Sequence, residues 1–429
     1  MPDLTPQRLP LLKEYRIPGL DLGENFVYPN YHGNSLLNVP PTICNLLDIP
    51  KIGHAPLDDE IFVSFGGMAK VNAKNVIVIL VDAMSLHRFR RWIHGGSVGI
   101  WKKLLENGVL APITSVTPST TSTCLPTLWS GLSPAEHGSV GYEMFLREYG
   151  TVANSITHTT FYVPGGKLIN AGFEPETVLD TITIGEHTRR FGIQPHAFQH
   201  YTIANSGLSR LFFRDFDIHS FGGTSDLWVG VRKLFETTPE ERKLVSVYFG
   251  QVDHLSHLYG PDDEYPAAAF ESFSADFETF FYTRLAPELR KDTVVLLLAD
   301  HGQTLTPTDP HYDLKNHPNL ARRLHMQPTG ENRLVYFYIR PGQTEAVREY
   351  LDRQFMGQFV QVEPGYAVEN GLFGPGTPHP NLLDRMGDLA AFPGGNAYLW
   401  WGSKENPIIG RHGGLTEEEM VVPFAIMPL

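Results

Sequence analysis

The sequence predicts an α/β protein in which helices cover both faces of a mostly parallel central sheet. Three apolar runs carry this prediction: Asn75–Val81, residues 243–249 and residues 293–299. Each run is apolar with almost no alternation, as expected of a strand that is buried on both faces. Helical stretches separate the runs, which favours parallel strands joined by crossover helices. In such sheets the ligand site lies beyond the carboxyl ends of the strands.

The other elements are predicted from periodicity and from helix breakers. Residues 100–107 predict a helix that ends at Gly108, because glycine commonly ends a helix. Residues 122–132 predict a second helix, with Pro126 in its first turn. Further strands are expected over residues 110–116, 333–339, 359–362 and 421–426, and further helices over residues 270–289 and 344–355.

The chain divides into four expected parts. Residues 1–70 are irregular and contain many Pro and Gly residues, which predicts an arm that wraps the core. Residues 71–150, 241–305 and 400–429 hold the strongest strands and are expected to form the catalytic α/β core. Residues 151–240 are expected to be an insertion, and residues 306–399 a cap-like insertion that contains a β-α-β unit.

The composition restricts the classes of function. The chain has 429 residues, of which 42% are hydrophobic and 19% charged, and this is typical of a globular protein with a large core. The net charge of −13 argues against a protein that coats nucleic acid or binds an anionic membrane. Cys44 and Cys124 are too few for a disulfide framework, and no apolar run reaches the ~20 residues of a membrane span. We therefore expect a cytoplasmic location without a membrane partner.

Carboxylates and histidines follow each of the three apolar runs. Asp82 ends the first, Asp253 and His257 follow the second, and Asp300 and His301 end the third. A buried carboxylate is costly unless it is paired or binds a metal, and Asp with His suits Zn²⁺ or Mn²⁺. Taken singly, Asp82 is better explained as a helix N-cap, and the pair of Asp253 and His257 fits a metal site and ordinary packing equally well.

Two further segments contain groups suited to catalysis. Residues 117–138 form a hydroxyl-rich loop that enters a helix, where free N–H groups favour an alkoxide or a phosphate. Ordinary capping by Ser and Thr would explain the same pattern. His412 lies in the sequence GRHGG before the last strand, where a glycine-rich turn is the simpler interpretation.

Together these segments resemble the alkaline phosphatase superfamily, in its nucleotide pyrophosphatase/phosphodiesterase-like branch. SGLSPAEHG resembles the family segment TGLxPxxHG, and VDHLSHLYGP resembles PDxxGHxxGP. ADHG resembles SDHG, and RHGG resembles THG. The resemblance covers residues 70–145, 243–305 and 405–429. It implies an alkaline-phosphatase-like α/β/α sandwich with inserted cap elements.

The resemblance also implies a nucleophile and two metal sites. Thr121 lies ten positions before Gly131 and matches the nucleophilic Thr of the family. One metal ion would be held by Asp82, Thr121, Asp300 and His301, and the other by Asp253, His257 and His412. Zinc is the expected metal, with manganese as the alternative. Three carboxylates and a Thr alkoxide would balance the charge of two divalent ions.

Two departures from related patterns limit what can be transferred. Cys124 begins Cys-Leu-Pro-Thr-Leu, which is similar to half of the sulfatase motif, but it lies three residues out of place and the motif's Arg is missing. A sulfatase is therefore rejected. Tyr142 stands where the family has an Asn that binds a phosphoryl oxygen. Tyr142 is a candidate for binding substrate through one hydrogen bond, and packing is the equal alternative.

The expected function is metal-dependent hydrolysis of phosphate diesters or nucleotide pyrophosphates through a phospho-threonine intermediate. A small phosphorylated molecule, such as a nucleotide, is the expected partner. The alternatives are a phosphomonoesterase, a phosphonoacetate hydrolase or a phosphoglycerate-mutase-like enzyme with the same ligands, and a non-catalytic metal-binding regulatory protein. Further candidate substrate contacts, each better explained as solvated surface, are His200, Tyr201, His317, Arg322, Arg323 and Arg333.

Overall fold

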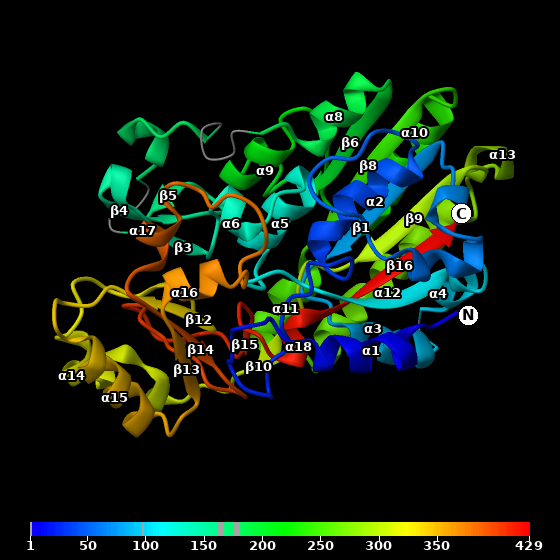
Figure 1. Cartoon of the computed structure of the whole chain (residues 1–429). Coiled ribbons are helices and arrows are strands. Elements are labelled where there is room, and N and C mark those ends of the chain that lie inside the picture. Colours follow the sequence, from blue (N-terminus) through cyan, green and yellow to red (C-terminus); the bar gives the residue numbers. More distant parts are fainter. Residues whose placement is uncertain (1, 97, 162–165, 176–180) are drawn as a thin grey trace.

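The three apolar runs form the middle of a central sheet. A computed structural model describes residues 2–96, 98–161, 166–175 and 181–429, in which this sheet has seven strands (Figure 1). Strand β1 (Asn75–Val81) lies between β8 (Arg242–Phe249) and β9 (Thr293–Leu298) and is parallel to both. Every residue of β1 is buried, which explains the absence of polar alternation. The prediction of an α/β fold with a mostly parallel sheet is confirmed.

The outer strands of the central sheet complete its topology. The strand order is β2-β16-β9-β1-β8-β6-β7, with β2 (Val109–Thr114) at one edge. Among the described strands of this sheet, only β16 (Val421–Pro428) runs opposite to the rest, so that it is antiparallel to β2 and to β9. Strands β6 (Ile193–His200) and β7 (Asp217–Phe221) lie at the opposite edge. Residues 151–240 are therefore not simply an insertion, because part of this segment extends the central sheet.

Helices cover both faces of the central sheet (Figure 1). On one face, Trp101, Trp228, Phe270, Phe273 and Phe277 pack together and join the helices there. These helices are α3 (Leu86–His94), α4 (Gly99–Leu105), α10 (Thr224–Thr237) and α12 (Glu264–Asp276). The other face carries α2 (Val39–Leu46), α5 (Thr121–Ser130), α6 (Pro134–His137), α8 (Ile184–Arg190) and α9 (Gly207–Phe212).

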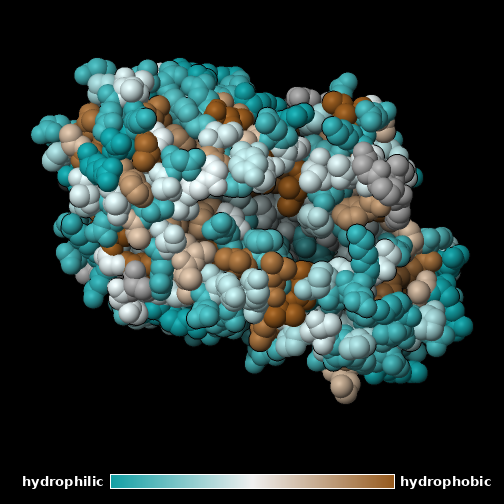
Figure 2. All heavy atoms as spheres, turned by 180° about the vertical axis from the view of Figure 1, so that it is seen from behind, coloured by the Kyte–Doolittle hydropathy of each residue, from teal (hydrophilic) through white to brown (hydrophobic). Residues whose placement is uncertain are grey.

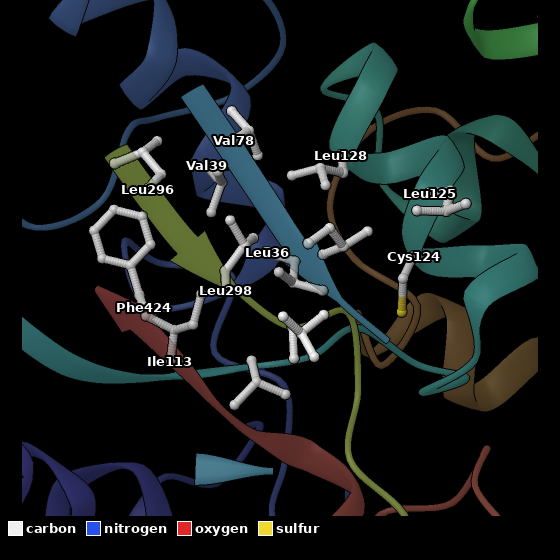
Figure 3. Packing of buried hydrophobic residues seen from close by; sticks show 14 of the residues in the cluster. Leu36, Val39, Val78, Ile113, Cys124, Leu125, Leu128, Leu296, Leu298 and Phe424 are labelled. Atoms are coloured by element: carbon white, nitrogen blue, oxygen red, sulfur yellow. The ribbon is translucent and has the colours of Figure 1, made fainter. Parts of the chain in front are cut away.

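The N-terminal segment is more regular than the arm that we expected. It contains α1 (Thr5–Glu14) as well as α2. Figure 3 shows Leu36 and Val39 beside Val78 of β1 and Leu128 of α5. Leu36 and Val39 are fully buried, so this segment contributes directly to the core. Its many Pro residues obscured the helices, since two of them open α2.

A second seven-stranded sheet lies beside the first within the described residues, in the order β13-β14-β12-β11-β3-β4-β5. It joins distant parts of the chain, so the expected boundaries at residues 150 and 306 do not separate its strands. Helix α15 (Thr344–Gln354) connects β12 to β13, but β14 lies between these two strands and is antiparallel to both. The strands are β3 (Glu143–Leu146), β4 (Thr151–Asn154), β5 (Thr159–Thr160), β11 (Thr329–Glu331), β12 (Leu334–Phe337), β13 (Phe359–Val362) and β14 (Leu389–Pro393).

Smaller elements complete the described chain. The helix expected over residues 270–289 is broken into α12, a π-helical segment over Phe277–Tyr282 and α13 (Pro287–Arg290). A two-stranded ribbon pairs β10 (Thr304–Leu305) with β15 (Gly410–Arg411). The remaining helices are α11 (Gln251–Tyr259), α14 (Pro318–Ala321), α16 (Pro364–Glu369), α17 (Leu382–Met386) and α18 (Glu417–Met420).

The surface is mainly polar on the face seen in Figure 2. Several small, separate groups of hydrophobic residues lie around a hollow near its centre. Among the described residues, no helix has both the length and the apolar character to cross a bilayer.

Candidate active site

The first cluster of candidate ligands lies where β1 and β9 end. Asp82, Asp300 and His301 are buried and offer ligand atoms within 4.8 Å of one another. The chain turns sharply here, since Ala83 has a φ of 58°. Backbone N–H groups of Ala83 and His301 donate to Asp300 Oδ1, at 3.3 and 3.0 Å. The turn thus fixes one carboxylate oxygen of Asp300 and leaves the other facing the cluster.

The second cluster combines α11 with the loop after β15. Asp253, His257 and His412 offer ligand atoms within 4.8 Å of one another. His257 lies one helical turn after Asp253, and its Nε2 is 3.2 Å from Asp253 Oδ1. His412 Nε2 approaches the same oxygen at 3.6 Å. The loop thus brings His412 to a pair that the helix has already formed.

Thr121, the first residue of α5, adjoins the first cluster. Its hydroxyl lies 3.1 Å from His301 Nε2 and 3.4 Å from Asp82 Oδ1. The rings of His301 and His412 stack with their centroids 4.0 Å apart, so the two clusters are neighbours. All seven residues that the family resemblance implied as ligands therefore meet at the carboxyl edge of the central sheet.

The three histidines share one orientation. In each ring Nδ1 faces a backbone carbonyl oxygen, that of Gly302 at 2.9 Å, Gly410 at 2.8 Å and Ser119 at 3.3 Å. A proton on Nδ1 satisfies these carbonyls and leaves Nε2 as an acceptor. This is the arrangement found in metal-binding histidines. Each Nε2 points into its own cluster, so that its lone pair is available to a cation.

The carboxylates of the first cluster also favour the binding of a cation. Burial raises the pKa of Asp82 well above its usual range, and Asp300 adds to the effect by charge repulsion. Burial likewise raises the pKa of Asp300 to about 7. Asp300 Oδ2 is buried and has no hydrogen-bond partner among the described residues. A divalent ion would satisfy this oxygen and relieve the repulsion, so the residues fit a metal.

The second cluster balances its charges internally. Burial would raise the pKa of Asp253, but the neighbouring His257 and His412 lower it below its usual range overall. Burial works against protonation of His257, and yet the charge of Asp253 raises its pKa to about 9. Burial lowers the pKa of His412 well below its usual range. This cluster can therefore hold either a proton or a metal between Asp253 and His257.

Two residues that support the clusters by hydrogen bonds were not predicted from the sequence. The hydroxyl of Tyr248, near the end of β8, donates to Asp82 Oδ2. Gln303 Nε2 donates to Asp253 Oδ1 at 3.1 Å. A signal for both was available, because Tyr248 interrupts an apolar strand next to the site and Gln303 follows the sequence ADHG directly.

A third residue reaches the site from the second sheet. Glu331, the last residue of β11, accepts hydrogen bonds from the Thr120 hydroxyl at 2.7 Å and from Tyr142 N at 2.9 Å. Burial raises the pKa of Glu331 to about 8. No sequence motif pointed to Glu331, because it lies in a segment without resemblance to the family.

A cavity of about 530 Å³ opens beside Thr121, Asp82 and Asp253. Its remaining wall is largely apolar and aromatic, with polar side chains such as Gln199 and His200. No Lys or Arg lines the cavity among the described residues. The apolar part of the wall consists of Leu80, Leu125, Trp129, Ile156, Ile203, Leu208, Phe213, Phe221 and Phe249.

The candidate substrate contacts fare differently. His200 lines the cavity, whereas the neighbouring Tyr201 is 65% exposed. Arg333 is fully buried in an ion pair with Glu419, and this disfavours a role in substrate binding. The other candidates are not among the described residues that line the cavity. His317 is buried and forms a hydrogen bond with the Tyr350 hydroxyl. Arg322 and Arg323 follow α14 beside the second sheet.

The proposed hydrogen bond from Tyr142 to substrate stays a prediction. The Tyr142 ring packs edge-to-face on Phe161, and its backbone N–H binds Glu331. The residue as a whole is 37% exposed.

The family described as type I phosphodiesterase / nucleotide pyrophosphatase matches residues 76–415 of the chain. The chain belongs to this family. The expected membership of the alkaline phosphatase superfamily is confirmed, and the four sequence segments that resembled family motifs lie within the matched range. Comparison with curated proteins gives no match.

Solved structures of family-like proteins share the fold. Murine ectonucleotide pyrophosphatase/phosphodiesterase 5 aligns with a TM-score of 0.58 at 16% identity, over 82% of this chain and 87% of the murine one. An inactive variant of the murine protein in complex with AMP gives 0.59 at 15% identity, with the same coverage. Phosphonoacetate hydrolase from Sinorhizobium meliloti 1021, in complex with phosphonoacetate, gives 0.59 at 16% identity, over 82% and 89% of the two chains.

Proposed function

We propose that the chain is a metal-dependent phosphodiesterase that works through a phospho-threonine intermediate on Thr121. The observation that carries the proposal is the position of the Thr121 hydroxyl, at the N-terminus of α5 and against the first cluster of candidate ligands, whose His301 stacks on His412 of the second. A helix N-terminus favours the negative charge of an alkoxide or a phosphate. The family of the chain and its fold support hydrolysis of a phosphorylated substrate.

The ligand clusters fit two divalent ions, and we propose zinc because His and carboxylate donors suit it. One ion would be held by Asp82, Thr121, Asp300 and His301, and the other by Asp253, His257 and His412. Bound metal would lower the pKa of the Thr121 hydroxyl and offset the charge on the phosphoryl oxygens. Manganese is the alternative metal.

The reaction consists of two displacements at phosphorus. Thr121 Oγ1 gives its proton to water and attacks, so that an O–P bond forms and the bond to the leaving alcohol breaks. The leaving oxygen takes up a proton from water. A water molecule then attacks the phospho-threonine, which restores the Thr121 hydroxyl and releases a phosphomonoester. The carboxylates and histidines of the two clusters would hold the metal ions in place during both displacements.

The cavity supports a diester with an uncharged organic group. Its apolar and aromatic wall would bury such a group directly beside Thr121. A carboxylate, as in phosphonoacetate, would find no Lys or Arg among the described lining residues. A nucleoside is one group that fits these requirements.

The first test compares bis-p-nitrophenyl phosphate with p-nitrophenyl phosphate, on zinc-loaded and on chelator-stripped protein. We expect metal-dependent hydrolysis that favours the diester. Thr121→Ala should abolish turnover and retain most of the metal. Thr123→Ala is the matched control, because Thr123 lies on the same helix and its buried hydroxyl has no hydrogen-bond partner among the described residues.

Each other outcome would point elsewhere. Substantial activity of Thr121→Ala would contradict the nucleophile. Preference for the monoester would indicate a phosphomonoesterase. Loss of both activities with metal bound would leave a narrow phosphonate substrate, a mutase or a non-catalytic metal-binding protein.

A further inference from the structure

Glu331 connects the second sheet to the helix that carries Thr121. Its Oε1 accepts a hydrogen bond from the Thr120 hydroxyl at 2.7 Å and another from Tyr142 N at 2.9 Å. Thr120 directly precedes the proposed nucleophile. One carboxyl oxygen from β11 therefore binds both the start of α5 and the start of the β3 hairpin.

The approach of Glu331 is close because glycines surround it. A Cβ at Gly413, next to the candidate ligand His412, would lie 2.6 Å from Glu331 Cβ. A Cβ at Gly141 would lie 2.7 Å from the Cα of Gly330. Glycine at both positions lets β11 pack directly against the two loops. The position of Glu331 is therefore fixed by the backbone on either side of it.

The hydrogen bond to Glu331 changes how α5 begins. Thr120 is the N-cap residue of α5, and threonine in this position usually accepts a hydrogen bond from an N–H of the first turn. Thr120 makes no such bond, because its hydroxyl is turned toward Glu331. The N–H group of Ser122, which such a cap would bind, consequently finds no acceptor among the described residues. The N–H group of Thr121 has no acceptor there either, and an N-cap side chain would not reach it.

We propose that Glu331 is a positioning residue that keeps the N-terminus of α5 uncapped. By accepting the hydrogen bond of the Thr120 hydroxyl, it leaves the N–H group of Ser122 free to bind a phosphoryl oxygen, beside the N–H group of Thr121, which an N-cap side chain would not occupy. The inference rests on the proposed function, in that it takes the phosphoryl group to bind beside Thr121. It assigns a role to a residue outside the ligand clusters and outside the motifs of the family.

The inference predicts a competition that mutagenesis can expose. Without Glu331, the Thr120 hydroxyl is free to turn back and cap the helix. Such a cap is worth roughly 1 kcal/mol, so an anion that must displace it should bind about five- to tenfold more weakly. If Thr120 lacks a hydroxyl, no cap can form and the loss should disappear.

The experiment is a double-mutant cycle with inorganic phosphate as the probe. Binding to zinc-loaded protein is measured by calorimetry for wild type, Glu331→Ala, Thr120→Val and the double variant. We expect Glu331→Ala to weaken phosphate binding about five- to tenfold, and the double variant to bind within about twofold of Thr120→Val. Glu331→Gln keeps an acceptor and should resemble wild type. Bound zinc, measured by mass spectrometry, should be the same in all variants.

Two controls keep the test decisive. Glu331→Met fills a similar volume without an acceptor and replaces Glu331→Ala if that variant does not fold. A double variant that binds phosphate as weakly as Glu331→Ala would overturn the inference, because the effect would then be a general disturbance. Unchanged phosphate affinity in Glu331→Ala, or no binding by the wild type, would overturn it as well.

The proposed function is tested by a different measurement, the hydrolysis of the two nitrophenyl esters. If zinc-loaded wild type hydrolyses neither nitrophenyl ester, the phosphodiesterase proposal falls, whatever the phosphate cycle shows. If both esters are cleaved and the cycle shows no coupling, only the role of Glu331 falls.

Discussion

Tyr248 and Gln303 hold the carboxylates of the two ligand clusters without belonging to them. The Tyr248 hydroxyl donates to Asp82, and Gln303 donates to Asp253 at 3.1 Å. Such supporting hydrogen bonds orient a ligand, and their loss typically costs about 10–100-fold in metal affinity. We therefore expect Tyr248→Phe to weaken zinc binding by roughly that factor, as measured by competition with a chromogenic chelator.

The matched control is Gln303→Leu, because it removes the corresponding bond from the other cluster. Each variant should weaken one of two zinc-binding steps and leave the other near its wild-type value. If both variants weakened the same step, the assignment of Asp82 and Asp253 to different ions would be wrong.

Glu143 makes the stability of the protein depend on pH. Burial raises its pKa to about 7, although Trp401 Nε1 donates to its carboxylate at 2.9 Å. The unfolded chain releases this proton near pH 4.5. The stabilising contribution is therefore complete below pH 4.5 and is lost as the pH rises through 7. We expect Glu143→Gln to raise the free energy of unfolding at pH 8 by about 2–3 kcal/mol.

The comparison is made by urea unfolding of both proteins at pH 5 and pH 8. The advantage of the variant should be largest at pH 8 and should shrink toward pH 5, because the wild-type carboxyl is then protonated. An advantage of equal size at both values would show that the effect does not come from this proton.

At the scale of elements, burial decides which strands the sequence reveals. Strands β1, β8 and β9 lie inside the sheet, so their apolar runs predicted them almost to the residue. Strand β7 lies at the edge and exposes Asp217, Ile218 and Ser220 to solvent, so its sequence carries no apolar run. Strand β6 beside it contains Pro195 and two His residues. These two of the seven strands therefore carried no continuous apolar run that could have predicted them.

Helix α5 also differs from its prediction. Pro126 lies in the middle of the helix rather than in its first turn, so it cannot donate to the carbonyl of Ser122. The Ser139 hydroxyl donates to that carbonyl instead, at 2.7 Å. Ser139 comes from the loop after α6, and the sequence gives no sign that its hydroxyl replaces a helix hydrogen bond.

The role of the Ser139 hydroxyl, which donates in place of the N–H that Pro126 lacks, can be tested. Ser139→Ala leaves the buried Ser122 carbonyl without its donor and should lower the free energy of unfolding by about 1–2 kcal/mol. In a Pro126→Ala background the backbone N–H at position 126 can take over, and the same change should cost clearly less. Urea unfolding of the four proteins measures the difference. Equal costs in both backgrounds would show that the hydroxyl does not compensate for the proline.

For the whole molecule, the sequence predicts the positions of the candidate ligands better than those of the residues that support them. Asp82, Asp253 and Asp300 follow buried strands, and parallel strands bring their carboxyl ends to one edge. Glu331 instead arrives from a second sheet whose strands are distant in the chain. Contacts of this kind depend on how the two sheets dock, and no local pattern encodes that arrangement.

A buried ion pair joins the second sheet to the loop that carries His412. Arg333 Nη2 lies 2.8 Å from Glu419 Oε2, and both side chains are fully buried. Glu419 also accepts from Gly414 N at 2.9 Å, two residues after His412. Removing one partner from such a pair leaves an uncompensated charge. We therefore expect Arg333→Met to lower the free energy of unfolding by about 3–5 kcal/mol.

Arg333→Met should also affect the candidate active site through Glu419. The unpaired Glu419 carboxylate would attract water, and the loop that carries His412 would become less ordered. Zinc bound near His412 should then dissociate faster than zinc bound near Asp300. Adding Glu419→Gln removes the stranded charge and keeps an acceptor for Gly414, so it should recover part of the lost stability. Urea unfolding and zinc release to a chelator measure the two effects separately. A loss of stability without faster zinc release would mean that the ion pair holds the two sheets together but leaves the site independent of them.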